Sequence, residues 1–130
     1  MNTEYEIWNL MYIGFISNAM FMVAMVLLTW LGFRFAARIY DDSNANIAAK
    51  VTATLYYLLV GIMFYNTAQI GGAIIGGAAE SLSALEEVSQ RGQDLIDRVE
   101  SGFVPGGLVS TTLNVVIVFF QLAMTWGKKA

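Results

Sequence analysis

Three long stretches of the chain contain no charged residue, and this pattern limits what the chain can fold into. They cover residues 7–33, 51–79 and 101–127. At a rise of about 1.5 Å per residue, each stretch is long enough as a helix to cross a hydrocarbon layer of roughly 30 Å. We therefore expect an all-α integral membrane protein with three transmembrane helices.

The composition agrees with this expectation. Of the 130 residues, 57% are hydrophobic and 13% are charged, whereas a soluble domain carries about 25% charged residues. The charges lie in the gaps between the apolar stretches. We expect a single membrane domain over residues 1–130, with spans near 7–33, 47–77 and 108–126. The first stretch is too long for a cleaved signal peptide and follows Glu4 and Glu6 rather than basic residues, so we expect it to be retained.

The ends of the first two helices have recognisable sequence signals. The first helix is expected from about Tyr5 to Tyr40, because Trp8 and Trp30 would then lie about 33 Å apart, close to the two bilayer interfaces. Residues 41–44, with the sequence Asp-Asp-Ser-Asn, form a turn and offer N-caps for the next helix. The second helix is expected from Ile47 to about residue 77.

Residues 80–101 are the only substantial polar segment of the chain. Its acidic and basic residues include two pairs in the favourable i,i+4 order, Glu87 with Arg91 and Asp94 with Arg98. Apolar residues recur among them at helical spacing: Leu82, Leu85, Val88, Leu95, Ile96 and Val99. We expect an amphipathic extramembrane helix, or two short helices separated at Gly92. Because an acidic helix is repelled by anionic headgroups, it should dock on protein, its own or a partner's.

The positive-inside rule gives an orientation. Five of the seven Lys and Arg residues fall in the first loop and the C-terminal tail, and the other two fall in the polar segment. We therefore expect an integral protein of a bacterial inner membrane, with the N-terminus outside and the C-terminus in the cytoplasm. The residues behind this count are Arg34, Arg38, Lys50, Lys128 and Lys129 on one side, and Arg91 and Arg98 on the other.

The sequence lacks the residues that most membrane chemistry needs. There is no His and no Cys, and no charged residue lies well inside a span. This argues against catalysis, a proton relay or an ion-coupled carrier, and it predicts no cofactor. Met20, Met22 and Met25 could offer thioethers to Cu(I), but the first two point to different helix faces, so we expect no metal. The few basic residues do not cluster, which gives no reason to expect nucleic acid.

Small residues in the second span are the most specific motif. Ala68, Gly72 and Gly76 follow one another at spacings of four, and Ala73 with Gly77 makes another such step. Small residues let helix backbones approach closely in lipid, where apolar burial gives no drive for association. The sequence alone leaves two interpretations open, packing within the chain or packing on another protein.

Polar side chains at membrane depth form a second signal. In lipid an amide without a hydrogen-bond partner is costly, so these side chains should face protein or water. We expect them to make hydrogen bonds between helices, and a lined pore or a polar ligand pocket is the alternative. The amides are Asn18, Asn66, Gln69, Asn114 and Gln121, and in the third span Ser110 and Thr125 lie on the same side as the last two.

These observations favour a non-catalytic accessory subunit of a larger integral membrane complex. Respiratory complexes and membrane-bound monooxygenases contain small subunits of this general kind. The alternative is a homo-oligomeric pore, because in its three spans, exterior N-terminus and short basic tail the chain resembles class I phage holins. This resemblance is one of topology and covers no sequence motif. A small membrane carrier is a third hypothesis, which the missing His, Cys and buried charge weaken.

The orientation can be tested by labelling. Single cysteines introduced at Thr3 and Gln90 should react with a membrane-impermeant thiol reagent on intact cells, because both positions are expected outside. A cysteine at Asn46 should react only after the cells are lysed. Labelling at Asn46 without labelling at Gln90 would reverse the orientation.

Overall fold

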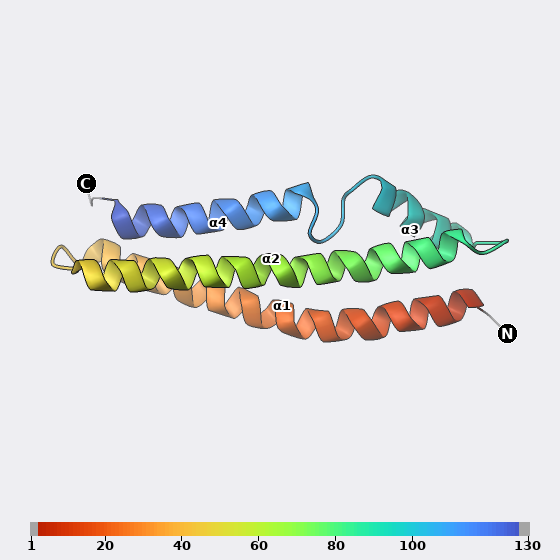
Figure 1. Cartoon of the computed structure of the whole chain (residues 1–130), viewed down its shortest axis with the longest axis horizontal. Helices are drawn as coiled ribbons and strands as arrows, with labels where there is room; N and C mark the ends of the chain where they lie inside the picture. The colour runs from red at the N-terminus through yellow and green to blue at the C-terminus, as the bar shows by residue number, and fades with distance from the viewer. Residues whose placement is uncertain (1–2, 128–130) are drawn as a thin grey trace.

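The computed structural model describes residues 3–127 and is built from helices joined by short turns. The helices are α1 (Thr3–Asp41), α2 (Ile47–Ser83), α3 (Gln90–Glu100) and α4 (Leu108–Trp126) (Figure 1). Three of them, α1, α2 and α4, are long and apolar enough to cross a membrane. The prediction of a helical protein with three membrane-length helices is therefore confirmed. Lys128 and Lys129, which the orientation uses, lie outside the described residues.

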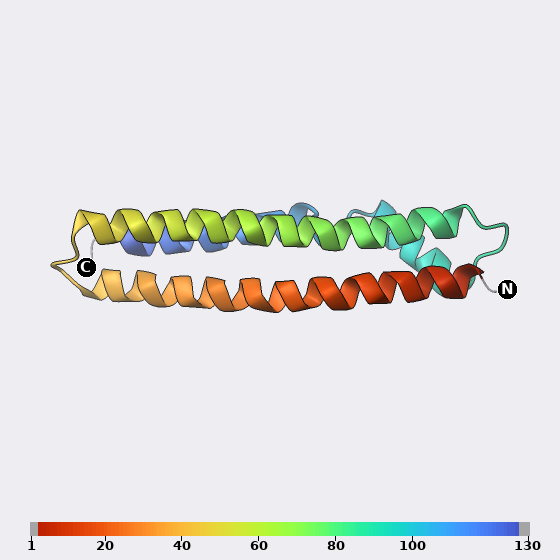
Figure 2. The ribbon, with the colours of Figure 1, turned by 60° about the horizontal axis from the view of Figure 1, so that its bottom comes forward.

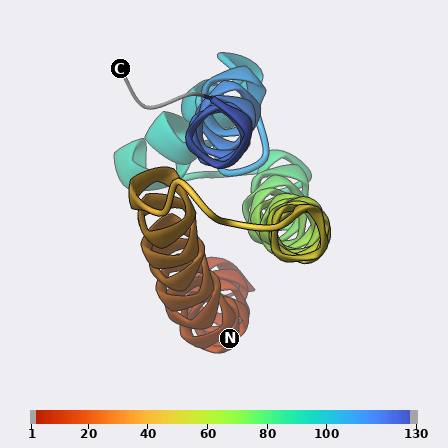
Figure 3. The same cartoon turned by 90° about the vertical axis from the view of Figure 1, so that its left-hand side faces the viewer.

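The long helices α1 and α2 form an antiparallel hairpin along the whole length of the molecule (Figure 2). At the end of the molecule that carries the α1–α2 turn, α4 packs against both helices. Seen from this end, the three helices lie at the corners of a triangle (Figure 3). At the opposite end, α3 folds back along α2 (Figure 1). The hairpin therefore carries α4 on one half and α3 on the other.

The helix ends follow from local capping. Asn46 caps α2 by accepting a hydrogen bond from the Ala49 amide at 2.8 Å, and Ser89 caps α3 by accepting one from the Gly92 amide at 3.1 Å. The boundary expected near residue 77 was too early, because nothing in Gly76 or Gly77 stops an apolar helix and α2 continues to Ser83. Gly92 does not break α3, which is one helix that includes it.

The end nearest the α1–α2 turn is held by close helix contacts. Ala36 and Tyr57 are fully buried, and the Tyr57 hydroxyl makes a hydrogen bond of 2.8 Å with the Thr125 hydroxyl on α4. Gly32 lies under the Gln121 side chain, where a Cβ would come within 2.7 Å of Nε2. The indole of Trp126 donates to the Thr54 hydroxyl at 2.8 Å. Absence of a side chain on α1 therefore lets α4 sit close to the hairpin.

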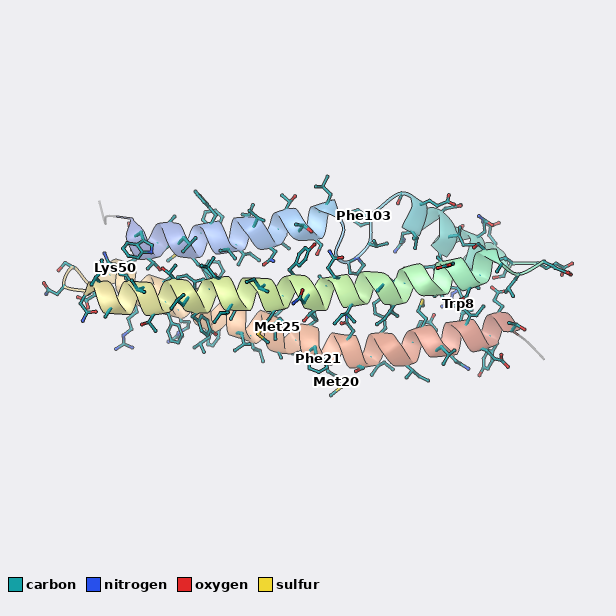
Figure 4. All side chains as sticks on the ribbon, viewed as in Figure 1. Trp8, Met20, Phe21, Met25, Lys50 and Phe103 are labelled. Carbon is teal, nitrogen blue, oxygen red and sulfur yellow. The ribbon has the colours of Figure 1, made fainter. Side chains whose placement is uncertain are left out.

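At the opposite end, the charged helix α3 covers a small apolar cluster. Leu82 is fully buried between α2 and α3, next to Ile96 of α3. Trp8 of α1 packs against this cluster and, in Figure 4, lies between α1 and the C-terminal part of α2. The Arg91 guanidinium lies 4.5 Å from the Trp8 ring centroid and donates a hydrogen bond to the Tyr12 hydroxyl. The charged segment thus docks on the chain's own helices.

The helices differ greatly in length. At about 1.5 Å per residue, the 39 residues of α1 and the 37 residues of α2 extend roughly 58 and 55 Å, whereas the 19 residues of α4 extend roughly 28 Å. One bilayer thickness matches α4. The α1–α2 hairpin is therefore about twice as long as α4.

Glu4, which precedes the charge-free stretch of α1, ties that helix to α3. Its carboxylate accepts hydrogen bonds from the Ser89 hydroxyl at 2.5 Å and the Ser89 amide at 3.3 Å. The indole of Trp8 donates to the same carboxylate at 3.3 Å. The side-chain hydrogen bond from Ser89 is the main reason that the pKa of Glu4 is lowered.

This contact should depend on pH. Because folding lowers the Glu4 pKa from its ordinary value of 4.5, the contact should be complete above pH 4.5 and be lost as pH falls through the lower folded value. The amide resonances of Ser89 and Gly92 should report that titration in the lipid-reconstituted protein. Glu4→Gln should abolish it, and Glu6→Gln should leave it in place. A titration that persists in Glu4→Gln would contradict the assignment.

Candidate helix-packing interface

The small residues predicted to form one packing face are divided between two surroundings in the structure. Ala68 is buried and Gly72 half-buried, and both lie under the turn that precedes α4. Ala73 and Gly77 are exposed, and Gly76 is half-buried with no neighbour where a side chain would project. The motif therefore serves the chain's own fold at one end and faces outward at the other.

Residues 102–107, here called the docking turn, occupy the inner part of the motif. A Cβ at Gly72 would collide with the Pro105 carbonyl oxygen. Gly106 has a φ of 81°, and a Cβ there would lie 3.0 Å from the Ala68 carbonyl oxygen. The Gln69 amide donates to the Gly106 carbonyl at 2.7 Å. Backbone thus rests on backbone, which explains why small residues are needed on both sides.

Asn18 and Gly71 form a further close contact between α1 and α2. Asn18 is 8% exposed, and a Cβ at Gly71 would come within 2.7 Å of its Nδ2 atom. Gly71 does not belong to the predicted motif. The available signal was its position beside Gly72, in a helix that must pass close to a buried amide.

Two amides of α4 make the hydrogen bonds that join it to the hairpin. Asn114 donates to the Gly61 carbonyl at 2.9 Å, and Gln121 donates to the Thr29 carbonyl at 3.1 Å. A Cβ at Gly61 would lie 2.9 Å from Val118 Cγ2. The sequence pattern identified the two amides but not the glycine that lets them approach. A lone glycine in a charge-free helix was the signal for it.

The outward part of the motif continues a row on α2 that includes Asn66. Asn66, Ala73 and Gly77 are separated by seven and four residues, so they share one helix face, and Gly76 borders it. The four residues together are here called the outer face of α2. The Asn66 side chain is exposed and makes no hydrogen bond to any residue that the structure describes. A Cβ at Gly76 or Gly77 would meet nothing within 4 Å.

The described acidic and sulfur-containing side chains are spread over the helices. Within residues 3–127, no three His, Cys, Asp or Glu side chains are grouped as metal ligands. The methionines of α1 are also dispersed: Met20 is 71% exposed and projects away from the other helices, whereas Met25 is 4% exposed and lies inside (Figure 4). The arrangement can hold helices together, and Gln69, Asn114 and Gln121 are used for that purpose.

The fold and this face define a helical protein with three membrane-length helices. No protein-family model, curated protein or solved structure that we compared with the chain matches it. Function must therefore be inferred from the chain's own surfaces.

The docking turn gives a direct test of the division within the motif. Gly72→Leu should push residues 102–107 away from α2, because the leucine would occupy the position of the Pro105 carbonyl. Overpacking of this kind costs about 1–3 kcal/mol, so amide hydrogen exchange in the turn should accelerate on the order of 10- to 100-fold. Gly76→Leu is the matched control and should leave the turn protected. Equal effects of the two variants would contradict this division.

Proposed function

We propose that the protein is a non-catalytic accessory subunit of a larger integral membrane complex. The outer face of α2 packs against a helix of another subunit. The observation that carries this proposal is the exposed Asn66 amide on the same face as Gly76 and Gly77, in a helix of membrane length.

The glycines support a partner because the chain's own packing does not use them. A glycine inside a helix costs about 1 kcal/mol relative to alanine. Gly76 and Gly77 leave open space where a side chain would project. Close approach of a second backbone, which dispersion and small residues stabilise in lipid, gives these positions a role.

Asn66 supports the same conclusion from its chemistry. A primary amide facing hydrocarbon lacks the hydrogen bonds that water would supply, and leaving them unmade is costly. Three other amides of the hairpin and α4, Gln69, Asn114 and Gln121, donate to carbonyls at 2.7–3.1 Å. A carbonyl or polar side chain on a partner helix would accept a hydrogen bond from the Asn66 amide in the same way.

The predicted orientation places the end of the molecule with the N-terminus and α3 outside the cytoplasm, and the α1–α2 turn inside. The missing His and Cys support the non-catalytic part of the proposal, since they are the commonest general base and the commonest thiol nucleophile. The accessory subunit would act by covering and positioning helices of its partners.

Gly76→Leu tests the proposal. It should insert normally, because no described residue lies within 4 Å of the position of the new Cβ. It should lower the amount of partner protein recovered in mild-detergent purification on the order of tenfold. Gly76→Ala is the matched control and should retain most of the partner. Ala24→Leu introduces the same leucine side chain at an exposed position of α1 and controls for a bulky side chain in general.

Two results would count against the proposal. Undiminished partners with Gly76→Leu would remove the outer face from the interface. Recovery of only further copies of this chain, sensitive to the same substitution, would favour the homo-oligomeric pore instead. Quantitative mass spectrometry of the purified material distinguishes these results.

A further inference from the structure

The end of the molecule nearest the α1–α2 turn has a groove that the proposed function does not use. It lies between the last turns of α1 and the first turns of α2 and has a volume of about 490 Å³. A second hollow of about 760 Å³ runs along α1 beside it and shares Phe35 and Arg38 with it. The groove is lined chiefly by Phe35, Arg38, Ile39, Ala49, Ala53 and Tyr56.

Most of this lining is hydrocarbon. Ala53 is buried between the helices, and its small side chain leaves space above it. Phe35 and Tyr56 pack edge to face, with ring centroids 5.3 Å apart, and form one wall. The Tyr56 hydroxyl donates to the Leu28 carbonyl at 2.8 Å, so its polar atom is already satisfied. The groove therefore suits a flexible apolar chain better than a polar solute.

Two arginines stand at this apolar groove. Arg38 lines both hollows, and Arg34 lies one helical turn before it and lines the second. The Arg34 guanidinium lies 5.2 Å from the Trp30 ring centroid. Asp41 also lines the second hollow, at its outer end, so the two guanidiniums and one carboxylate leave a net positive charge. Arginine is well suited to phosphate because it offers a planar set of donors.

Aromatic and basic residues place this groove at a membrane interface. Trp30 accompanies Arg34, and on the neighbouring helices Lys50 lies 5.6 Å from the Trp126 ring centroid. Figure 4 shows Lys50 at this end of the molecule. Trp and basic residues are enriched at the headgroup level, and basic pockets between membrane helices bind anionic headgroups. The guanidiniums therefore lie close to headgroup depth, and the groove runs inward from Arg38 past Phe35 to Tyr56.

We propose that this groove binds an anionic glycerophospholipid. Its phosphate contacts Arg34 and Arg38, and one acyl chain lies over Ala53, along the wall that Phe35 and Tyr56 form. An anionic headgroup is favoured over a zwitterionic one because it brings no ammonium group toward the two arginines. This site is independent of the outer face of α2, so its test does not depend on the proposed partner.

Trp30 can report occupancy. In full-length protein carrying Trp8→Phe and Trp126→Phe, Trp30 is the only tryptophan. The protein is reconstituted in phosphatidylcholine vesicles that contain a small fraction of either phosphatidylglycerol or phosphatidylcholine with brominated acyl chains. Quenching of Trp30 should indicate a local preference for the anionic lipid on the order of tenfold. Equal quenching by the two brominated lipids would overturn the proposal.

Variants separate the headgroup contact from the acyl contact. Arg34→Gln with Arg38→Gln should remove the preference, whereas the matched changes Arg91→Gln with Arg98→Gln, both on α3, should retain it. Ala49→Phe, at an exposed position that lines the groove, should also reduce quenching by the anionic lipid. Retained preference in the Arg34 and Arg38 variant, or unchanged quenching in Ala49→Phe, would overturn the site.

The source of the phosphate is tested in the same assay. Inorganic phosphate, added at constant ionic strength, should not displace the brominated phosphatidylglycerol, because it brings no acyl chain to the groove. If phosphate alone abolishes the preference, the arginines form an anion site and the lipid proposal is wrong. Circular dichroism of each reconstituted variant checks that its helices are intact.

Discussion

Wherever this chain lies in hydrocarbon, its backbone must satisfy its own hydrogen bonds, and the rest of the structure depends on that constraint. Helices are the solution for single segments, because every interior amide and carbonyl is paired within the segment. This is why α1 and α2 run without interruption through several glycines that would weaken a helix in water. Turns are confined to the ends of the long helices and to residues 102–107, where the backbone rests against α2.

The same environment changes what holds the helices together. Lipid tails are as apolar as leucine, so burying apolar surface does little to join α4 to the hairpin. Close approach and hydrogen bonds take its place. Gly32 and Gly61 remove side chains at two crossings, and at the same crossings Gln121 and Asn114 donate to backbone carbonyls. Each amide thus depends on a neighbouring glycine to come within reach of its acceptor.

The sequence was sufficient to predict the long helices, but not to predict which of their faces are covered by other parts of the chain. Charge-free length predicted α1, α2 and α4. The turn at residues 41–44 predicted the start of α2 at Ile47, but the residue that caps the helix is Asn46, outside that turn. The end of α2 was misplaced because an apolar helix contains no local signal that distinguishes a membrane boundary from further helix. Spacing placed Gly72 and Gly76 on one motif, but only tertiary structure could separate them, since the docking turn covers one and leaves the other open. Arg34 and Arg38 were recognisable as interfacial, whereas the groove beside them depends on how α1 and α2 cross.

The hydrogen bonds of α4 also have a consequence for the order of assembly during synthesis. Gln121 donates to a carbonyl of α1 and Asn114 to a carbonyl of α2, so the two acceptors are in reach together only when the hairpin is already paired. Those acceptors are made first, because the ribosome completes α1 and α2 before α4 begins. We therefore expect α4 to insert last, against a hairpin that is already paired. A ribosome paused before residue 108 would leave a hairpin in which the Thr29 and Gly61 carbonyls lack the hydrogen bonds that α4 donates.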